Sequence, residues 1–155
     1  MHRRDLLSLL LTASAGMVLG SQAAWAGYPV TRSDADWKKA LSPAAYDVLR
    51  HQGTEMPYSS PLDMNTKKGT YSCAGCDTAL FSSDTKYDSR TGWPSFWKPL
   101  PKAVATRTDT SEMMMRTEVL CSGCGGHLGH VFTDGPKPTG LRYCMNGVAM
   151  RFKAA

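Results

Sequence analysis

The chain has 155 residues, a length that fits a single domain. It carries 18 basic and 13 acidic residues, a formal net charge of +5, and no run of Lys or Arg is longer than two. A charge this small and this scattered excludes the concentrated basic surface of nucleic-acid-binding proteins and indicates a mildly basic, solvated surface.

The first 26 residues have the layout of an export signal. His2-Arg3-Arg4 is a short positive region, residues 6–20 are apolar, and Ala24-Trp25-Ala26 is a small-x-small cleavage pattern. The two arginines are also typical of a twin-arginine signal. The apolar stretch is shorter than the ~20 residues of a spanning helix, which disfavours an uncleaved membrane anchor. We therefore expect cleavage after residue 26 and export to the periplasm, without stable membrane insertion.

The rest of the chain divides into a linker over residues 27–36 and one folded domain over residues 37–155. A short helix is expected over residues 34–41. A second helix is expected to follow Ser42, because serine is a favourable helix cap and Pro43 suits the first helical position.

This second helix is expected to continue over residues 44–52 and to end at Gly53, since glycine is common just after a helix. Ala45, Val48 and Leu49 give it a narrow apolar face. A face of this width indicates that the helix packs against a larger element.

After Gly53, short β-prone segments alternate with Gly, Pro, Ser and Asp. The expected strands are 70–71, 79–81, 104–107, 113–120, 131–132 and 141–152. No helical pattern lies between them, which disfavours the crossovers of a parallel sheet. The predicted fold class is mainly β with an α+β margin: one antiparallel domain flanked by short N-terminal helices.

Three consecutive methionines, residues 113–115, fall within one of the predicted strands. This run is compatible with a methionine-rich binding surface or a metal site. Because alternate strand residues face opposite ways, we favour the interpretation that one or two of them fill the core.

The strongest local signal is a pair of CxxC motifs, Cys73-Ala-Gly-Cys76 and Cys121-Ser-Gly-Cys124. Four thiolates complete a tetrahedral coordination sphere, which is typical of a structural zinc site. The alternatives are two disulfides, which an exported chain allows, and a redox-active CxxC. A set of Cys121, Cys124 and two nearby histidines is disfavoured, because a finger usually needs about 12 residues between its pairs.

The fifth cysteine, Cys144, stands between an arginine and an asparagine in GLRYCMNG. A lone cysteine is most often a small buried hydrophobe. In a strand, however, Arg142, Cys144 and Asn146 would share one face. A guanidinium beside a thiol favours the thiolate, so this pattern indicates an activated nucleophile.

Two further motifs carry side chains suited to a reaction site. His127-Leu-Gly-His130 can supply a general acid, because imidazole titrates near neutral pH, although either histidine taken alone is more often structural. In Gly92-Trp-Pro-Ser-Phe-Trp97, Phe96 is expected in the core. Trp93, at the turn, is expected to stay partly exposed as a pocket wall.

Taken together, these motifs resemble the type B methionine sulfoxide reductases, which reduce the R-epimer of methionine sulfoxide. The resemblance rests on CAGC (73–76), FSSDTKYDSRTGWPSF (81–96), RTEVLCSGCGGHLGHVF (116–132) and DGPKPTGLRYCMNG (134–147). It runs from about Trp37 to Phe152, nearly the whole expected mature chain. The family's fold is two antiparallel sheets in a tent-like or barrel-like shell.

The resemblance also implies a role for each matching residue. Cys144 matches the nucleophile, and His127, His130 and Asn146 match the polar groups around the substrate oxygen. Trp93 matches the wall that packs on the substrate methyl group, and Arg142 the arginine two residues before the nucleophile. The zinc ligands matched are Cys73, Cys76, Cys121 and Cys124.

Many members of that family carry a second, resolving cysteine where this chain has Thr91. We therefore expect the Cys144 sulfenic acid to be reduced in trans, by a thioredoxin-like protein or another thiol. The expected function is repair of oxidised proteins or peptides by a monomeric enzyme under oxidative stress. The alternative is a non-catalytic zinc-binding chaperone or docking module on the same fold.

Overall fold

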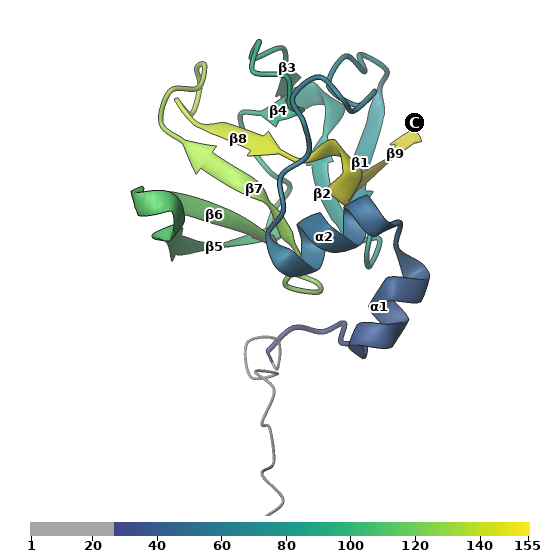
Figure 1. The fold of residues 1–155 in the computed structure, drawn as a ribbon. Coiled ribbons are helices and arrows are strands. Elements are labelled where there is room, and N and C mark those ends of the chain that lie inside the picture. The colour runs from purple at the N-terminus through teal and green to yellow at the C-terminus, as the bar shows by residue number, and fades with distance from the viewer. Residues whose placement is uncertain (1–26) are drawn as a thin grey trace, which may run out of the picture.

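The computed structural model describes residues 27–155, so the expected signal peptide over residues 1–26 lies outside the described part of the chain. Two α-helices, α1 (Asp34–Ala40) and α2 (Pro43–His51), precede nine strands, with three short 3₁₀ helices among the strands (Figure 1). Within residues 27–155, no helix is long and apolar enough to cross a membrane.

Both helices begin at the serine caps that their sequences favour. Ser33 accepts a hydrogen bond from the Asp36 amide, and Ser42 from the Ala45 amide. The second helix buries Ala45, Val48 and Leu49, as expected. It ends one residue early, because Gln52 adopts the left-handed conformation (φ 61°) ahead of Gly53.

The segment before these helices already contacts the domain. The amide of Val30 donates to the carbonyl of Gly123 at 2.8 Å, and the Val30 side chain packs against the core. The first helix also begins at Asp34, inside the range 27–36 expected to be a linker.

The strands form two antiparallel sheets, as the mainly β expectation requires. The three-stranded sheet has the order β2 (Ala79–Ser82), β1 (Gly69–Cys73) and β9 (Met150–Ala154). The six-stranded sheet has the order β3 (Lys86–Tyr87), β4 (Ser95–Phe96), β8 (Arg142–Met145), β7 (His127–Phe132), β6 (Arg116–Cys121) and β5 (Val104–Asp109).

The segment predicted as one strand over 141–152 is two strands in different sheets. β8 pairs with β7 and β4, whereas β9 pairs with β1, and the 3₁₀ helix η3 (Gly147–Ala149) joins them. A side chain does not fit at Gly147, where η3 begins, because a Cβ there would lie 1.9 Å from the Ser60 hydroxyl. The sequence pattern missed this change of sheet.

The expectation for Met113–Met115 is wrong. These residues are not core strand residues but belong to the exposed connection between β5 and β6, which protrudes from the sheet (Figure 1). The 3₁₀ helix η2 (Ser111–Met113) forms this hairpin tip. Strand β6 starts only at Arg116, where the cross-strand pairing with Asp109 begins.

The hydrophobic core lies between the two sheets and α2. Phe96 is fully buried, as expected, and stacks on Phe81 with ring centroids 4.3 Å apart. Tyr71 meets the Phe96 ring edge-on at 5.0 Å. Because Phe96 and Tyr143 pair across β4 and β8, the six-stranded sheet turns these aromatic side chains to the core. Its opposite face is left for polar residues.

Candidate active site and metal centre

One row of polar residues crosses five strands of the six-stranded sheet. The cross-strand partners run from Ser95 in β4 through Cys144 in β8, His130 in β7 and Glu118 in β6 to Arg107 in β5. Directly paired residues have their side chains on the same face of a sheet. The thiol and the imidazole, 14 residues apart in the chain, are therefore neighbours.

The half-buried Cys144 thiol meets a chain of hydroxyl groups. Its sulfur lies 3.8 Å from the Thr91 Oγ1 atom, which is 2.8 Å from the Ser89 hydroxyl. Ser89 is in turn 2.7 Å from the Ser95 hydroxyl, and Ser95 is fully buried. Hydroxyl donors beside a sulfur stabilise its anionic form.

The balance of forces on this thiol differs from the sequence expectation. Burial raises the pKa of Cys144 above its usual range, and the contacts with Thr91, Arg142 and Ser95 only partly oppose that rise. The arginine is already engaged, because Arg142 makes two hydrogen bonds to the Asp134 carboxylate at 2.9 and 2.8 Å and lies over the Phe132 ring. The Arg142 guanidinium is close to the sulfur, but its charge is paired with Asp134, so it does not lower the pKa of Cys144 below that of ordinary cysteine.

Each of the two histidines is held by a carboxylate. His127 Nδ1 lies 2.7 Å from Glu118 Oε1, and His130 Nε2 lies 2.8 Å from Asp109 Oδ2. Because a carboxylate only accepts, these ring nitrogens carry the hydrogens, and the opposite nitrogens, His127 Nε2 and His130 Nδ1, are left for a ligand. The His127 Nε2 atom is buried without a hydrogen-bond partner. It is an acceptor in the neutral ring and donates to a substrate oxygen only when the ring is protonated.

Burial and charge set the ionisation of this group. Burial lowers the pKa of His130, and the hydrogen bond to Asp109 only partly offsets that effect. The pKa of Asp109 is lowered by hydrogen bonds from Ser111 and His130. Burial opposes ionisation of Glu118, but hydrogen bonds from His127 and Arg107 outweigh it and lower its pKa. The imidazoles are thus held beside two carboxylates that stay ionised.

A small polar cavity opens beside the two histidines. Its walls include His127, His130, Glu118 and Asp109, and its volume is about 60 Å³. The imidazoles therefore border a space open to a small polar group, on the face of the sheet that carries Cys144.

The segment after α2 forms hydrogen bonds with two of the predicted site residues, Asn146 and Trp93, and it passes β8 in Figure 1. Its residue Glu55 makes contacts through both its backbone and its side chain. The Glu55 amide donates to the Asn146 Oδ1 atom at 2.9 Å, and the Trp93 indole donates to the Glu55 carbonyl at 3.1 Å. Asn146 is buried and also donates to the Leu128 carbonyl. The indole of Trp93 remains partly exposed, as expected.

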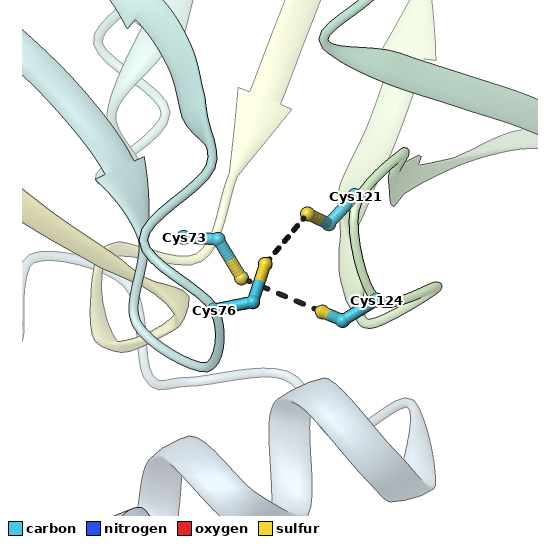
Figure 2. Close-up of side chains that lie close together, drawn as sticks. All are labelled: Cys73, Cys76, Cys121 and Cys124. Atoms are coloured by element: carbon cyan, nitrogen blue, oxygen red, sulfur yellow. Dashed lines mark hydrogen bonds between the residues drawn. The ribbon is translucent and has the colours of Figure 1, made fainter. Parts of the chain in front are cut away.

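The four cysteines of the CxxC motifs lie together in the fold. Figure 2 shows the sulfurs pointing toward one another from two turns, with Cys73 3.7 Å from Cys124 and Cys76 3.5 Å from Cys121. All four sulfurs lie within 4.8 Å of one another. The first motif follows β1 and the second follows β6, so the cluster joins the ends of the two sheets.

This donor set fits a four-coordinate zinc ion. Zinc–sulfur bonds of ~2.3 Å in a tetrahedron place sulfurs about 3.8 Å apart, close to the spacings in the cluster. A disulfide needs about 2.05 Å, and all five cysteines are free. Hydrogen bonds among the sulfurs lower the pKa of Cys76 and Cys121 and raise that of Cys73 and Cys124.

Comparison with known proteins identifies the family of this chain. The family model described as "SelR domain" matches residues 41–154. The chain belongs to the SelR domain family. A relative in Leptospira interrogans named "Peptide methionine sulfoxide reductase MsrB" is 57% identical over 127 residues, covering 81% of this chain and 97% of that protein. A relative of the same name in Agrobacterium fabrum is 54% identical over 125 residues, covering 80% and 93%.

The structure adds site residues of this SelR domain that sequence reasoning did not single out. They are the two carboxylates, Glu118 and Asp109, the hydroxyl residues Ser89 and Ser95, and Glu55. For Glu118 a signal was available, since an acidic residue directly before the buried run Val119–Cys121 is costly unless it is paired. For Glu55, in an irregular segment, the sequence holds no comparable signal.

Glu55 gives a testable prediction. Its carboxylate accepts hydrogen bonds from the Gly147 and Val148 amides, at 2.5 and 2.9 Å, and so caps η3 just after Asn146. We expect Glu55→Ala to lower the free energy of unfolding by about 1–3 kcal/mol, the cost of leaving such donors unpaired. Urea unfolding checks this value. Glu55→Gln, which keeps one acceptor oxygen, should cost less, and equal losses would contradict the capping role.

Proposed function

We propose that this protein reduces methionine-R-sulfoxide in proteins or peptides to methionine, with the Cys144 sulfur as nucleophile. Family membership makes it a methionine sulfoxide reductase, an oxidoreductase; the epimer, the nucleophile and the steps belong to the proposal. The observation that carries it is the cross-strand pairing of Cys144 with His130, beside the cavity lined by both histidines.

The proposed reaction follows from the polarity of a sulfoxide. The Cys144 thiolate attacks the electrophilic sulfoxide sulfur, and negative charge develops on the sulfoxide oxygen. A proton from His127 or His130 neutralises that charge, a contribution typically worth ~10²–10⁴-fold in rate. The sulfur–oxygen bond of the sulfoxide and the new bond between the two sulfurs then break, the oxygen passes with the proton to the Cys144 sulfur as sulfenic acid, and methionine is released. The Cys144 sulfur is thereby oxidised by two electrons and the sulfoxide sulfur is reduced by two.

The other predicted residues position the substrate. Trp93 would pack on the substrate methyl group with its partly exposed ring, which the hydrogen bond to Glu55 holds in place. Asn146 would orient the oxygen through the second hydrogen of its amide nitrogen, since the first is used by Leu128. Arg142, fixed by Asp134, would add positive potential beside the sulfur.

Regeneration is proposed to need an external thiol. Four of the five cysteines form the clustered metal site, and the polar group beside Cys144 is the Thr91 hydroxyl. An intramolecular disulfide would have to take a sulfur from that cluster. A thioredoxin-like protein or a small thiol would instead attack the sulfenic acid and release water, and a second thiol group would then reduce the mixed disulfide to free Cys144.

An epimer-resolved assay tests this function. Purified protein with dithiothreitol should reduce peptide methionine-R-sulfoxide and leave the S-epimer unchanged. Mass spectrometry after one equivalent of substrate, without reductant, should find one oxygen on the Cys144 peptide. Reduction of neither epimer would favour the non-catalytic zinc-binding module, and a disulfide between Cys144 and a cluster cysteine would contradict regeneration in trans.

A second prediction concerns Thr91. Burial raises the pKa of Cys144 and the Thr91 hydroxyl opposes that rise, so thiolate should form above the pKa of ordinary cysteine. The rate of Cys144 alkylation by iodoacetamide should therefore increase with pH through a midpoint on the alkaline side. Thr91→Val removes the hydroxyl at constant shape and should move the midpoint further upward, whereas Thr91→Ser should leave it near the wild-type value. A midpoint below that of free cysteine would contradict this assignment.

The metal is proposed to be structural zinc, held by Cys73, Cys76, Cys121 and Cys124. With four protein ligands a zinc ion has no open position, so it supplies folding energy and not chemistry on the substrate. Export to the periplasm is proposed from residues 1–26 alone, and the mass of the exported chain tests cleavage. The exported protein is proposed to be a monomer.

A further inference from the structure

The methionines divide sharply between two environments. Seven of the nine lie in residues 27–155. Met145 and Met150, on either side of η3, are 0% and 5% exposed, whereas Met113 and Met115 are 102% and 84% exposed. Among the described residues, five of the six exposed large hydrophobic side chains are methionines. The exposed sites thus carry the one apolar side chain whose oxidised form is the substrate of the proposed reaction.

The hairpin tip between β5 and β6 is built to hold Met113–Met115 in solvent. Glu112 and Met113 both take left-handed backbone conformations, with φ of 54° and 56°. Arg116 stabilises this turn, because it donates hydrogen bonds to Asp109 and Ser111 and forms a salt bridge with Glu112. The backbone is therefore fixed while the methionine side chains project away from the sheet.

Exposed thioethers react with two-electron oxidants such as hydrogen peroxide. The methionine sulfur gains one oxygen and is oxidised by two electrons, and the peroxide is reduced to water. The product is a pair of sulfoxide epimers, and separate enzymes reduce the two epimers. Burial blocks access of the oxidant to Met145 and Met150 but not to the tip.

We propose that Met113–Met115 are a reversible oxidation site of this protein, restored from the R-sulfoxide by Cys144 of a second copy of the chain. The inference rests on the proposed function. In the restoring step the sulfoxide oxygen passes to Cys144, giving methionine and sulfenic acid. Two external thiol groups then reduce the sulfenic acid to thiol and water and are themselves oxidised to a disulfide.

A second copy is needed because the tip lies too far from its own nucleophile. Glu118 and Cys144 are two strand spacings apart, about 10 Å, and Met115 lies three residues beyond Glu118, about another 10 Å. The two backbones are thus on the order of 14 Å apart in the sheet, a gap that the cysteine and methionine side chains do not bridge. A protruding tip can instead enter the site of another molecule.

The test uses the folded Cys144→Ser chain as substrate. It is treated with hydrogen peroxide, cleared with catalase, and mixed with dithiothreitol and about one hundredth the amount of wild-type protein. Trypsin separates the methionines cleanly, because residues 108–116 hold only the three tip methionines, residues 143–151 hold the two buried ones, and residues 51–67 hold Met56 and Met64. A synthetic peptide containing methionine-R-sulfoxide is present in the same tube.

Peroxide should oxidise peptide 108–116 well before peptide 143–151, and the wild-type protein should then remove about half of the tip sulfoxide, the R-epimer share. In oxidised wild-type protein alone, the rate of repair per molecule should fall in proportion to dilution.

Equal oxidation of both peptides, or a tip sulfoxide that persists while the synthetic peptide is reduced, would overturn the inference and leave the proposed function standing. Dilution-independent repair would overturn the second-copy step. If the synthetic peptide also stays oxidised, the proposed function and the inference fall together.

Discussion

Replacing Cys144 with serine is expected to reduce turnover of methionine-R-sulfoxide by about 10⁴-fold or more, the scale on which loss of a nucleophile acts in other enzymes. A serine hydroxyl is rarely ionised at neutral pH and does not take up oxygen as a sulfenic acid does. The substitution is nearly isosteric, and Thr91 and Ser95 beside it are hydroxyl residues that tolerate another hydroxyl. The measurement is reductase activity with dithiothreitol.

The control for this variant is its structure. Its metal content, near-ultraviolet circular dichroism and melting temperature should match those of the wild type, because Cys144 lies outside the four-cysteine cluster. Activity within tenfold of wild type in a folded Cys144→Ser protein would remove Cys144 from the mechanism. Loss of fold would instead assign it a structural role.

Removing one ligand of the cluster should have the opposite pattern, with loss of the fold as the primary effect. Cys76→Ser leaves three sulfurs at a site that joins β1 in one sheet to β6 in the other. Structural zinc contributes ~10–16 kcal/mol in small domains, comparable to the ~5–15 kcal/mol total stability of a typical protein. We therefore expect Cys76→Ser to bind far less than one zinc per chain and to lose its cooperative thermal transition.

Cys76 and Cys144 form a matched pair for this test, because both are half-buried cysteines changed to the same residue. Metal analysis and thermal melting, with and without a strong chelator, distinguish them. The Cys144→Ser protein should melt at the same temperature as the wild type, and the chelator should lower the melting temperature of both. A Cys76→Ser protein with an unchanged melting temperature would show that the cluster is not a stabilising metal site.

The local parts of the fold could be predicted because their signals are local. Ser42 begins α2 by accepting a hydrogen bond from a free backbone amide of the first turn, and Pro43 suits the first helical position because it has no amide hydrogen to satisfy. Neither effect depends on what the helix packs against. The CxxC pairs indicated their own cluster because two thiolates three residues apart wrap one ion. The burial of Phe96 and the partial exposure of Trp93 followed from their places in a Gly-Trp-Pro turn and the segment after it.

The predictions that failed depended on partners outside the segment itself. Met113–Met115 are apolar and β-prone, yet the hairpin closes at Arg116 and Asp109, which leaves the methionines in solvent. Residues 141–152 have continuous strand propensity, yet Gly147 meets Ser60 and the chain changes sheet. The two-residue strands β3 and β4 were missed, because only their neighbours in the sheet make them strands.

The sequence by itself determined which side chains are available: one cysteine outside the CxxC motifs, two histidines in HLGH, an exposed indole, and four cysteines in two motifs. The tertiary structure decided which of them meet. The period of a strand tells which residues share a face, but the neighbour across the sheet depends on register, which turns, bulges and packing set over long distances. Register pairs Cys144 with His130, and His130 with Glu118, while Arg142 is bound to Asp134, so that burial outweighs the cation at the thiol.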